Sequence, residues 1–202
     1  KICIVDCKER TMTDTNITFD TRVMSMVCVN DEMVLIGTLS WFVFAYNQDT
    51  KEMLWQQRLH DAVLSMEVYQ DDDGDKSQRL FAGLADGTVA IFEALSPSCT
   101  SYDLFYLPIG QSPVTCLRLL GNKLWCACGN NVSIIHASTL DPKDRFTVSA
   151  NPYDTILSLV PGLPGVWISV RGSSVLELWD KETLSCRMLY DTRTGRFPNL
   201  RK

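Results

Sequence analysis

The feature that most constrains the fold is a motif of two apolar runs separated by a tight turn, which recurs four times along the chain. In the clearest copy, Asp86-Gly87 separates the runs 80–85 and 88–92. Asp and Gly tolerate the positive φ that a tight turn demands, so this sequence is a strong signal for a β-hairpin. The repeat is marked by four aligned valines at spacings of 46, 43 and 43 residues: Val43, Val89, Val132 and Val175.

Each predicted hairpin is flanked by two further strand candidates. Upstream, a small or hydroxyl residue lies between apolar ones: 24–26, 64–66, 114–116 and 157–159. Downstream lies a fourth strand in each copy: 53–55, 104–106, 145–148 and 186–190. Four strands per repeat is the count for a propeller blade. A β-sandwich also has short strands at regular intervals, but it has no reason to repeat the same residue types at the same offsets. We therefore expect an all-β chain that forms a β-propeller.

The repeats divide the chain into segments. We expect the tail of a preceding blade, four recognisable blades and a terminal basic loop, at 1–22, 23–61, 62–112, 113–154, 155–192 and 193–202. Closing a ring takes at least four blades and commonly about seven. The four copies are therefore expected to be part of a seven-bladed ring.

The fourth copy carries a resemblance to a known repeat. Its third strand ends in Trp179-Asp180, and the run 174–183 resembles a WD40 repeat. The pairs aligned with Trp179-Asp180 in the other copies depart from the WD40 pattern: Tyr46-Asn47, Phe92-Glu93 and Ile135-His136. No copy has the Gly-His pair of a well-formed WD40 repeat. The resemblance implies a divergent WD40-like propeller, in which the histidine-serine-tryptophan-aspartate network of standard blades cannot be assumed.

The same run is also similar to a blade of the leucine-rich-repeat Roco kinases, which join a Ras-like GTPase, a Ser/Thr kinase and a C-terminal WD40 domain. The runs 83–92, 123–126 and 165–171 resemble the propellers of JNK-pathway scaffold proteins and Rho exchange factors. Over about residues 23–192, the resemblance implies a non-catalytic protein-interaction and regulatory module of a Roco-type kinase with a GTPase domain. The alternative is the docking propeller of a JNK-pathway scaffold or of a Rho/Rab guanine-nucleotide exchange factor.

Composition excludes several classes of protein. The chain is 46% hydrophobic and 21% charged, which is typical of an ordered globular protein. Its net charge of −5 argues against a partner that needs a basic surface, such as nucleic acid. No run approaches the ~18 apolar residues of a membrane span. The eight cysteines are too few for a disulfide scaffold, so we interpret them as reduced, core-filling thiols of a cytoplasmic protein.

The sequence offers little catalytic or metal-binding chemistry. Both histidines, His60 and His136, have ordinary structural or surface interpretations. Cys126 and Cys128 lack the second ligand pair that a zinc site needs, and the acidic run 71–75 departs from a calcium-binding loop. We therefore expect no enzyme activity, cofactor or metal in this segment. A propeller enzyme is the weaker alternative, because it needs acidic or histidine side chains gathered at the central channel.

Partner binding is expected from five exposed positions. Trp41 lies in a hairpin turn where a polar residue is typical, and an exposed aromatic side chain can anchor an interface. The segment after the fourth blade is turn-rich and basic, which suits an acidic partner surface or a kinase domain of the same polypeptide. The predicted contacts are Trp41, Arg171, Arg193, Arg196 and Arg201. The expected partners are proteins, as other domains of the same chain, separate molecules or a second copy.

Overall fold

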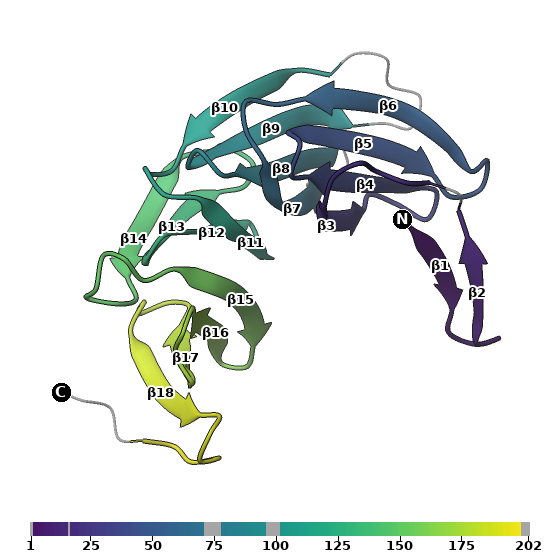
Figure 1. The fold of residues 1–202 in the computed structure, drawn as a ribbon. Helices are drawn as coiled ribbons and strands as arrows, with labels where there is room; N and C mark the ends of the chain where they lie inside the picture. Colours follow the sequence, from purple (N-terminus) through teal and green to yellow (C-terminus); the bar gives the residue numbers. More distant parts are fainter. Residues whose placement is uncertain (1, 16, 71–77, 96–101, 199–202) are drawn as a thin grey trace.

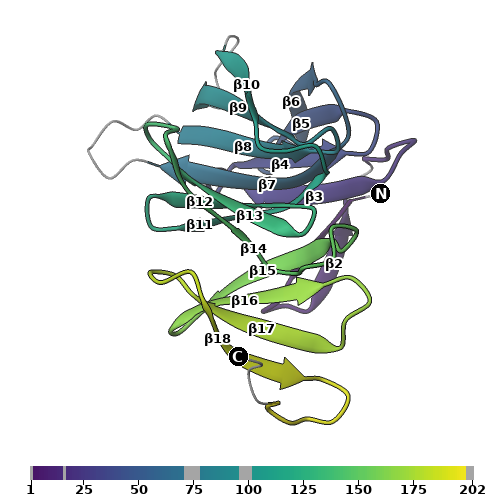
Figure 2. The same cartoon turned by 90° about the vertical axis from the view of Figure 1, so that its left-hand side faces the viewer.

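The computed structural model describes residues 2–15, 17–70, 78–95 and 102–198. Within these residues it is built from β-strands joined by turns, with no helix. Four antiparallel sheets of four strands each follow a two-stranded N-terminal sheet. Figure 1 shows the four sheets succeeding one another along an arc, and Figure 2 shows the same arc from its side. The all-β fold and the four propeller blades are confirmed.

Each sheet is a meander of neighbouring strands. The N-terminal sheet pairs β1 (Cys3–Asp6) with β2 (Thr11–Asp14). The first blade contains β3 (Val23–Cys28), β4 (Met33–Thr38), β5 (Phe42–Asn47) and β6 (Glu52–Arg58). The second contains β7 (Val63–Gln70), β8 (Gln78–Leu84), β9 (Thr88–Leu95) and β10 (Leu104–Pro108). The third contains β11 (Val114–Leu120), β12 (Lys123–Cys128), β13 (Asn131–His136) and β14 (Pro142–Thr147). The fourth contains β15 (Ile156–Gly162), β16 (Gly165–Val170), β17 (Val175–Asp180) and β18 (Cys186–Asp191).

The turn between β8 and β9 explains the sequence signal that predicted it. Gly87 has a φ of +89°, which an L side chain rarely adopts. A Cβ atom there would lie 2.2 Å from the carbonyl oxygen of Gly110, so the position has no room for a side chain. The Asp86 carboxylate accepts hydrogen bonds from the Thr88 backbone N–H at 2.9 Å and hydroxyl at 2.7 Å. The geometry of the turn therefore accounts for both residue types of the Asp-Gly pair.

The hydrophobic core lies between successive blades. Residues alternate between the two faces of a strand, so Leu35 of β4 packs with Val63 and Leu80 of the second blade. Val34 and Ile36 point to the opposite face and pack with Ile2 of the N-terminal segment. All of β4 is consequently buried, which is the pattern of a strand covered on both faces.

Two sequence interpretations need correction. Val43 and Val89 pair with Gly37 and Gly83, but the equivalent position of the fourth blade is Leu176, paired with Ser169, and not Val175. Its hairpin turn is longer, which shifts the alignment by one residue. The prediction that the cysteines fill the core is wrong for three of them. Cys28 is exposed at the end of β3, and Cys3 and Cys7 in the N-terminal segment are exposed as well.

Candidate protein-interaction surfaces

The basic segment after β18 begins as a closed turn, although its sequence predicts a long exposed loop. The Asp191 backbone N–H donates to the carbonyl oxygen of Arg196 at 2.9 Å, and the Gly195 N–H donates to the Asp191 carbonyl oxygen at 2.8 Å. The Asp191 carboxylate accepts the backbone N–H of Arg193 at 2.9 Å and the hydroxyl of Thr194 at 3.0 Å. The hydrogen bond from Arg193 is the main cause that lowers the pKa of Asp191. Arg193 and Arg196 are thus presented from an ordered turn, which we call the basic turn (191–196).

Arg171 lies at the same end of the fourth blade. It is exposed at the close of β16, and its backbone N–H donates to the carbonyl oxygen of Thr155 at 2.8 Å. Ser174, in the same hairpin turn, accepts the backbone N–H of Thr192 at 2.9 Å. The hairpin turn and the basic turn are therefore adjacent. Within the described residues, none of the arginines Arg171, Arg193 and Arg196 forms an ion pair.

The two remaining predicted contacts are not part of this cluster. Trp41 lies in the turn between β4 and β5 and is 40% exposed. The second and third blades separate it from the fourth blade along the arc (Figure 1). Arg201 lies outside the described residues, so its position relative to the basic turn stays a prediction.

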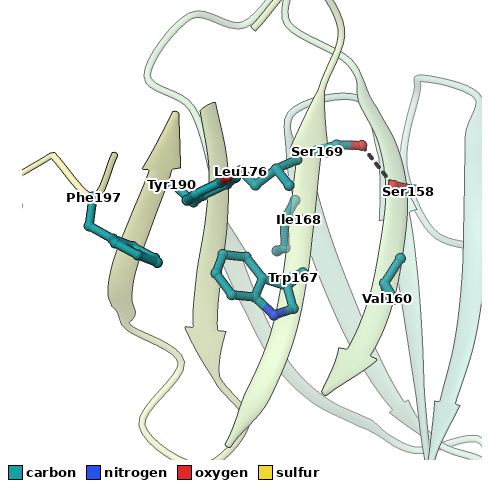
Figure 3. Close-up of a pocket in the computed structure, with 8 residues that line it drawn as sticks. All are labelled: Ser158, Val160, Trp167, Ile168, Ser169, Leu176, Tyr190 and Phe197. Carbon is teal, nitrogen blue, oxygen red and sulfur yellow. Dashed lines mark hydrogen bonds between the residues drawn. The ribbon is translucent and has the colours of Figure 1, made fainter. Parts of the chain in front are cut away.

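An apolar groove lies beside the basic turn, on the face of the fourth blade that turns away from the third (Figure 3). Its volume is about 530 Å³. Phe197, which follows the basic turn, packs against Tyr190 of β18 with 5.1 Å between the ring centroids. The hydroxyls of Ser158 and Ser169 hydrogen-bond to each other at 2.7 Å. The groove is lined by Ser158, Val160, Trp167, Ile168, Ser169, Leu176, Tyr190 and Phe197.

The equivalent positions of the third blade indicate what kind of surface packs on this groove. Trp167 and Leu176 take the pairing positions that Trp125 and Val132 take in the third blade. Trp125 and Val132 are fully buried, in the cluster where the fourth blade packs on the third. The groove is therefore a sheet-packing surface. No single motif in the sequence indicates this groove, but the repeat aligned on Leu176 identifies its residues.

Among the remaining candidates for chemistry, three thiols are buried and one histidine stacks on an aromatic ring. Burial raises the pKa of the thiols of Cys116, Cys126 and Cys128, which disfavours the reactive thiolate. His60 stacks on Tyr106 with 3.7 Å between the ring centroids. No group of three or more metal-ligating side chains occurs in the described residues, and the acidic run 71–75 lies outside them.

No helix in the described part of the chain is long and apolar enough to cross a membrane. The surfaces described above combine exposed arginines, aromatic rings and an apolar sheet face, a combination that suits contacts with other polypeptides.

Comparisons with known proteins agree with this architecture. The chain is 32% identical over 109 residues to Rho guanine nucleotide exchange factor 10-like protein of Bos taurus, covering 52% of this chain and 9% of that protein. It is 28% identical over 136 residues to C-Jun-amino-terminal kinase-interacting protein 3 of Mus musculus, covering 66% and 10%. The chain thus spans about a tenth of the length of these relatives.

Among solved structures, a chain of the mitotic checkpoint complex has the same fold, with a TM-score of 0.71 at 16% identity over 94% of this chain and 57% of that one. A family model described as the LRRK2 beta propeller matches residues 1–194, nearly the whole chain. The chain therefore belongs to the LRRK2 beta propeller family.

Proposed function

We propose that this propeller is a non-catalytic protein-interaction and regulatory module of a larger cytoplasmic signalling protein, a Roco-type Ser/Thr kinase with a GTPase domain elsewhere in its chain. Membership of the LRRK2 beta propeller family supports the Roco assignment. Its partners are proteins, either other domains of the same polypeptide or separate molecules, and it needs no cofactor.

The observation that carries the interaction role is the basic turn beside the apolar groove. Arg193 and Arg196 are exposed on a turn fixed by the Asp191 hydrogen bonds. Because the backbone of the turn is already ordered, binding does not have to order it, and arginine can hold a carboxylate through two parallel hydrogen bonds. The two arginines of the basic turn have a charge opposite in sign to the net charge of the chain, which is −5. The partner surface that fits it is acidic.

The test is charge reversal at the basic turn in the full-length protein. R193E/R196E is expected to change Ser/Thr kinase output or GTP hydrolysis several-fold if the propeller regulates those domains. The matched control is K143E/K181E, which reverses two exposed lysines on β14 and in the β17–β18 turn. Equal activities for both double variants and the unmodified protein would contradict the proposal, provided circular dichroism shows that each is folded.

A second candidate is favoured by the relatives named above. An exchange factor and a kinase-interacting protein each match more than half of this chain. In that case the full-length polypeptide has no kinase domain. The propeller then binds a protein on which another domain of the same polypeptide acts. Nucleotide exchange on purified small GTPases distinguishes this from the Roco assignment, in which the purified protein itself phosphorylates serine or threonine.

A further inference from the structure

The β4–β5 turn differs from its counterparts in the side chains that it exposes. Leu39 and Trp41 are 42% and 40% exposed at its tip. By pairing register, they take the places of Ala85 and Gly87 in the second blade. The first blade therefore presents two large apolar side chains where the second has a small residue and a glycine. Each exposed apolar side chain forgoes the stability that its burial would contribute.

Trp41 also adopts a backbone conformation that favours glycine. Its φ is +76°, and the hairpin turns of the other three blades place glycine in this region, at Gly87, Gly129 and Gly172. A bulky residue with positive φ is strained, and such strain is typical of positions selected for function. Folding alone would favour glycine at position 41.

The turn is braced so that the strained conformation persists. The hydroxyl of Thr38, which is fully buried, donates to the carbonyl oxygen of Phe42 at 3.0 Å and lies 3.2 Å from the hydroxyl of Ser40. The carbonyl oxygen of Trp41 accepts the backbone N–H of Leu59 at 2.7 Å, which ties the turn to the link between the first two blades. The backbone that carries the indole is thus held in one conformation at the surface.

A cation adjoins the indole. The guanidinium carbon of Arg58 lies 5.3 Å from the centre of the Trp41 ring. Arg58 is exposed and, within the described residues, forms no ion pair. We name Leu39, Trp41 and Arg58 the aromatic-basic surface.

The carboxylates in the neighbouring turns accept hydrogen bonds within their own turns, and in the described residues they form no ion pair with Arg58. Asp61 accepts the backbone N–H of Ala62 at 2.7 Å, and Asp86 accepts two hydrogen bonds from Thr88. Arg58 therefore keeps its hydrogen-bond donors for a partner, and the indole face beneath it orients the guanidinium.

We propose that the aromatic-basic surface binds a protein segment in which a carboxylate side chain lies next to a large apolar one. The carboxylate pairs with Arg58, and the apolar side chain packs on Trp41 and Leu39. This inference rests on the proposed interaction role but concerns a surface separate from the basic turn. A negative binding result for the aromatic-basic surface therefore does not count against the basic turn, and a negative result for the basic turn does not count against the aromatic-basic surface.

The test uses a fluorescent peptide in which glutamate alternates with leucine and phenylalanine, titrated with the full chain and followed by anisotropy. W41G and R58E are each expected to weaken binding by about tenfold. Replacing the glutamates of the peptide by glutamine is expected to weaken it similarly. The matched control is M53A, because Met53 is 41% exposed on β6 of the same blade and lies outside the surface.

W41G separates binding from folding, because glycine suits the positive φ. Its melting temperature is expected to stay within a few degrees of the unmodified chain, so weaker binding cannot be attributed to unfolding. The proposal is overturned if the peptide fails to bind, if W41G binds it as well as M53A does, or if the glutamine peptide binds equally. It is also overturned if W41G abolishes a dimer seen by sedimentation, since the occupant is then a second copy of the chain.

Discussion

Asp180 shows how one side chain closes a turn that the repeat uses more than once. Its carboxylate accepts the backbone N–H groups of Glu182 and Thr183, at 2.7 and 2.8 Å, and pairs with Arg187. In the first blade, the amide oxygen of Asn47 accepts the two equivalent backbone N–H groups at 2.8 and 2.9 Å. Asn and Asp both supply the acceptor that the turn requires, but only Asp adds a charge.

This difference predicts how stability depends on pH. The backbone hydrogen bonds from Thr183 and Glu182 are the main causes that lower the pKa of Asp180, and Arg187 adds to them. Because the folded pKa lies below the ordinary value of 3.8, the charge contributes stability above that pH and loses it as pH falls through the folded pKa. D180N keeps the acceptor but not the charge. It should be less stable than the unmodified chain at neutral pH.

Urea unfolding from neutral pH down to about pH 2 measures this difference. The midpoints of D180N and the unmodified chain are expected to converge at the acid end. D180A, which removes the acceptor as well, is expected to remain the least stable variant at every pH. A gap between D180N and the unmodified chain that is constant with pH would show that the charge has no role.

At the scale of the strand, two glycines allow neighbouring blades to approach closely. A Cβ atom on Gly83 of β8 would lie 2.8 Å from the Cγ1 atom and 2.9 Å from the carbonyl oxygen of Val114, which begins the next blade. Gly37 of β4 has the same relation to Val63, at 2.6 Å from its Cγ1 atom. In both places, the glycine leaves room for the valine that begins the next blade.

G83A is expected to lower the free energy of unfolding by about 2 kcal/mol, because the neighbouring backbone must move to admit a methyl group. G162A is the control, since a Cβ there would meet Trp167 no closer than 3.4 Å, an ordinary contact. It should change the free energy by less than about 0.5 kcal/mol. Chemical unfolding of the three chains gives both values, and equal losses for G83A and G162A would rule out this packing role.

The repeat predicted the strands well because each hairpin carries its own local signal. Asp86-Gly87 marks a turn whatever surrounds it. Register was harder to predict in the fourth blade, because Val175 and Leu176 are both apolar and pattern alone cannot choose between them. The register is defined in the structure by the pairing of Leu176 with Ser169.

The candidate surfaces were only partly predictable. Trp41 stood out as an aromatic residue in a turn, but its positive φ and its contact with Arg58 depend on strand pairing that brings β5 and β6 together. The groove on the fourth blade could not be predicted from the sequence, because Val160 and Trp167 are residue types that also occur in the buried core of a strand. Exposure is a property of what packs on a strand, and the strand's own sequence does not encode it.

At the scale of the whole molecule, the blades differ in how fully their faces are covered. The third blade is packed on both faces, by the second and the fourth. The fourth is packed on one face only, and the groove occupies the other. In β12, Leu124 to Cys128 are all buried, whereas Trp167 and Ser169 of β16 are only partly buried. In a stack where each unit contacts only its neighbours, local stability follows the number of covered faces.

Amide hydrogen exchange followed by mass spectrometry should therefore rank the blades. Peptides from β8 and β12 are expected to exchange slowest, those from β16 and β17 faster, and those from the two-stranded pair β1 and β2 fastest. A polypeptide that binds in the groove would slow exchange in β16 and β17 without changing β8, because it covers the face of the fourth blade that lies away from the third. Equal protection of β12 and β16 in the 202-residue chain would mean that the groove is already covered, for instance by a second copy. Repeating the measurement at several protein concentrations distinguishes that case, because only protection from a second copy falls on dilution.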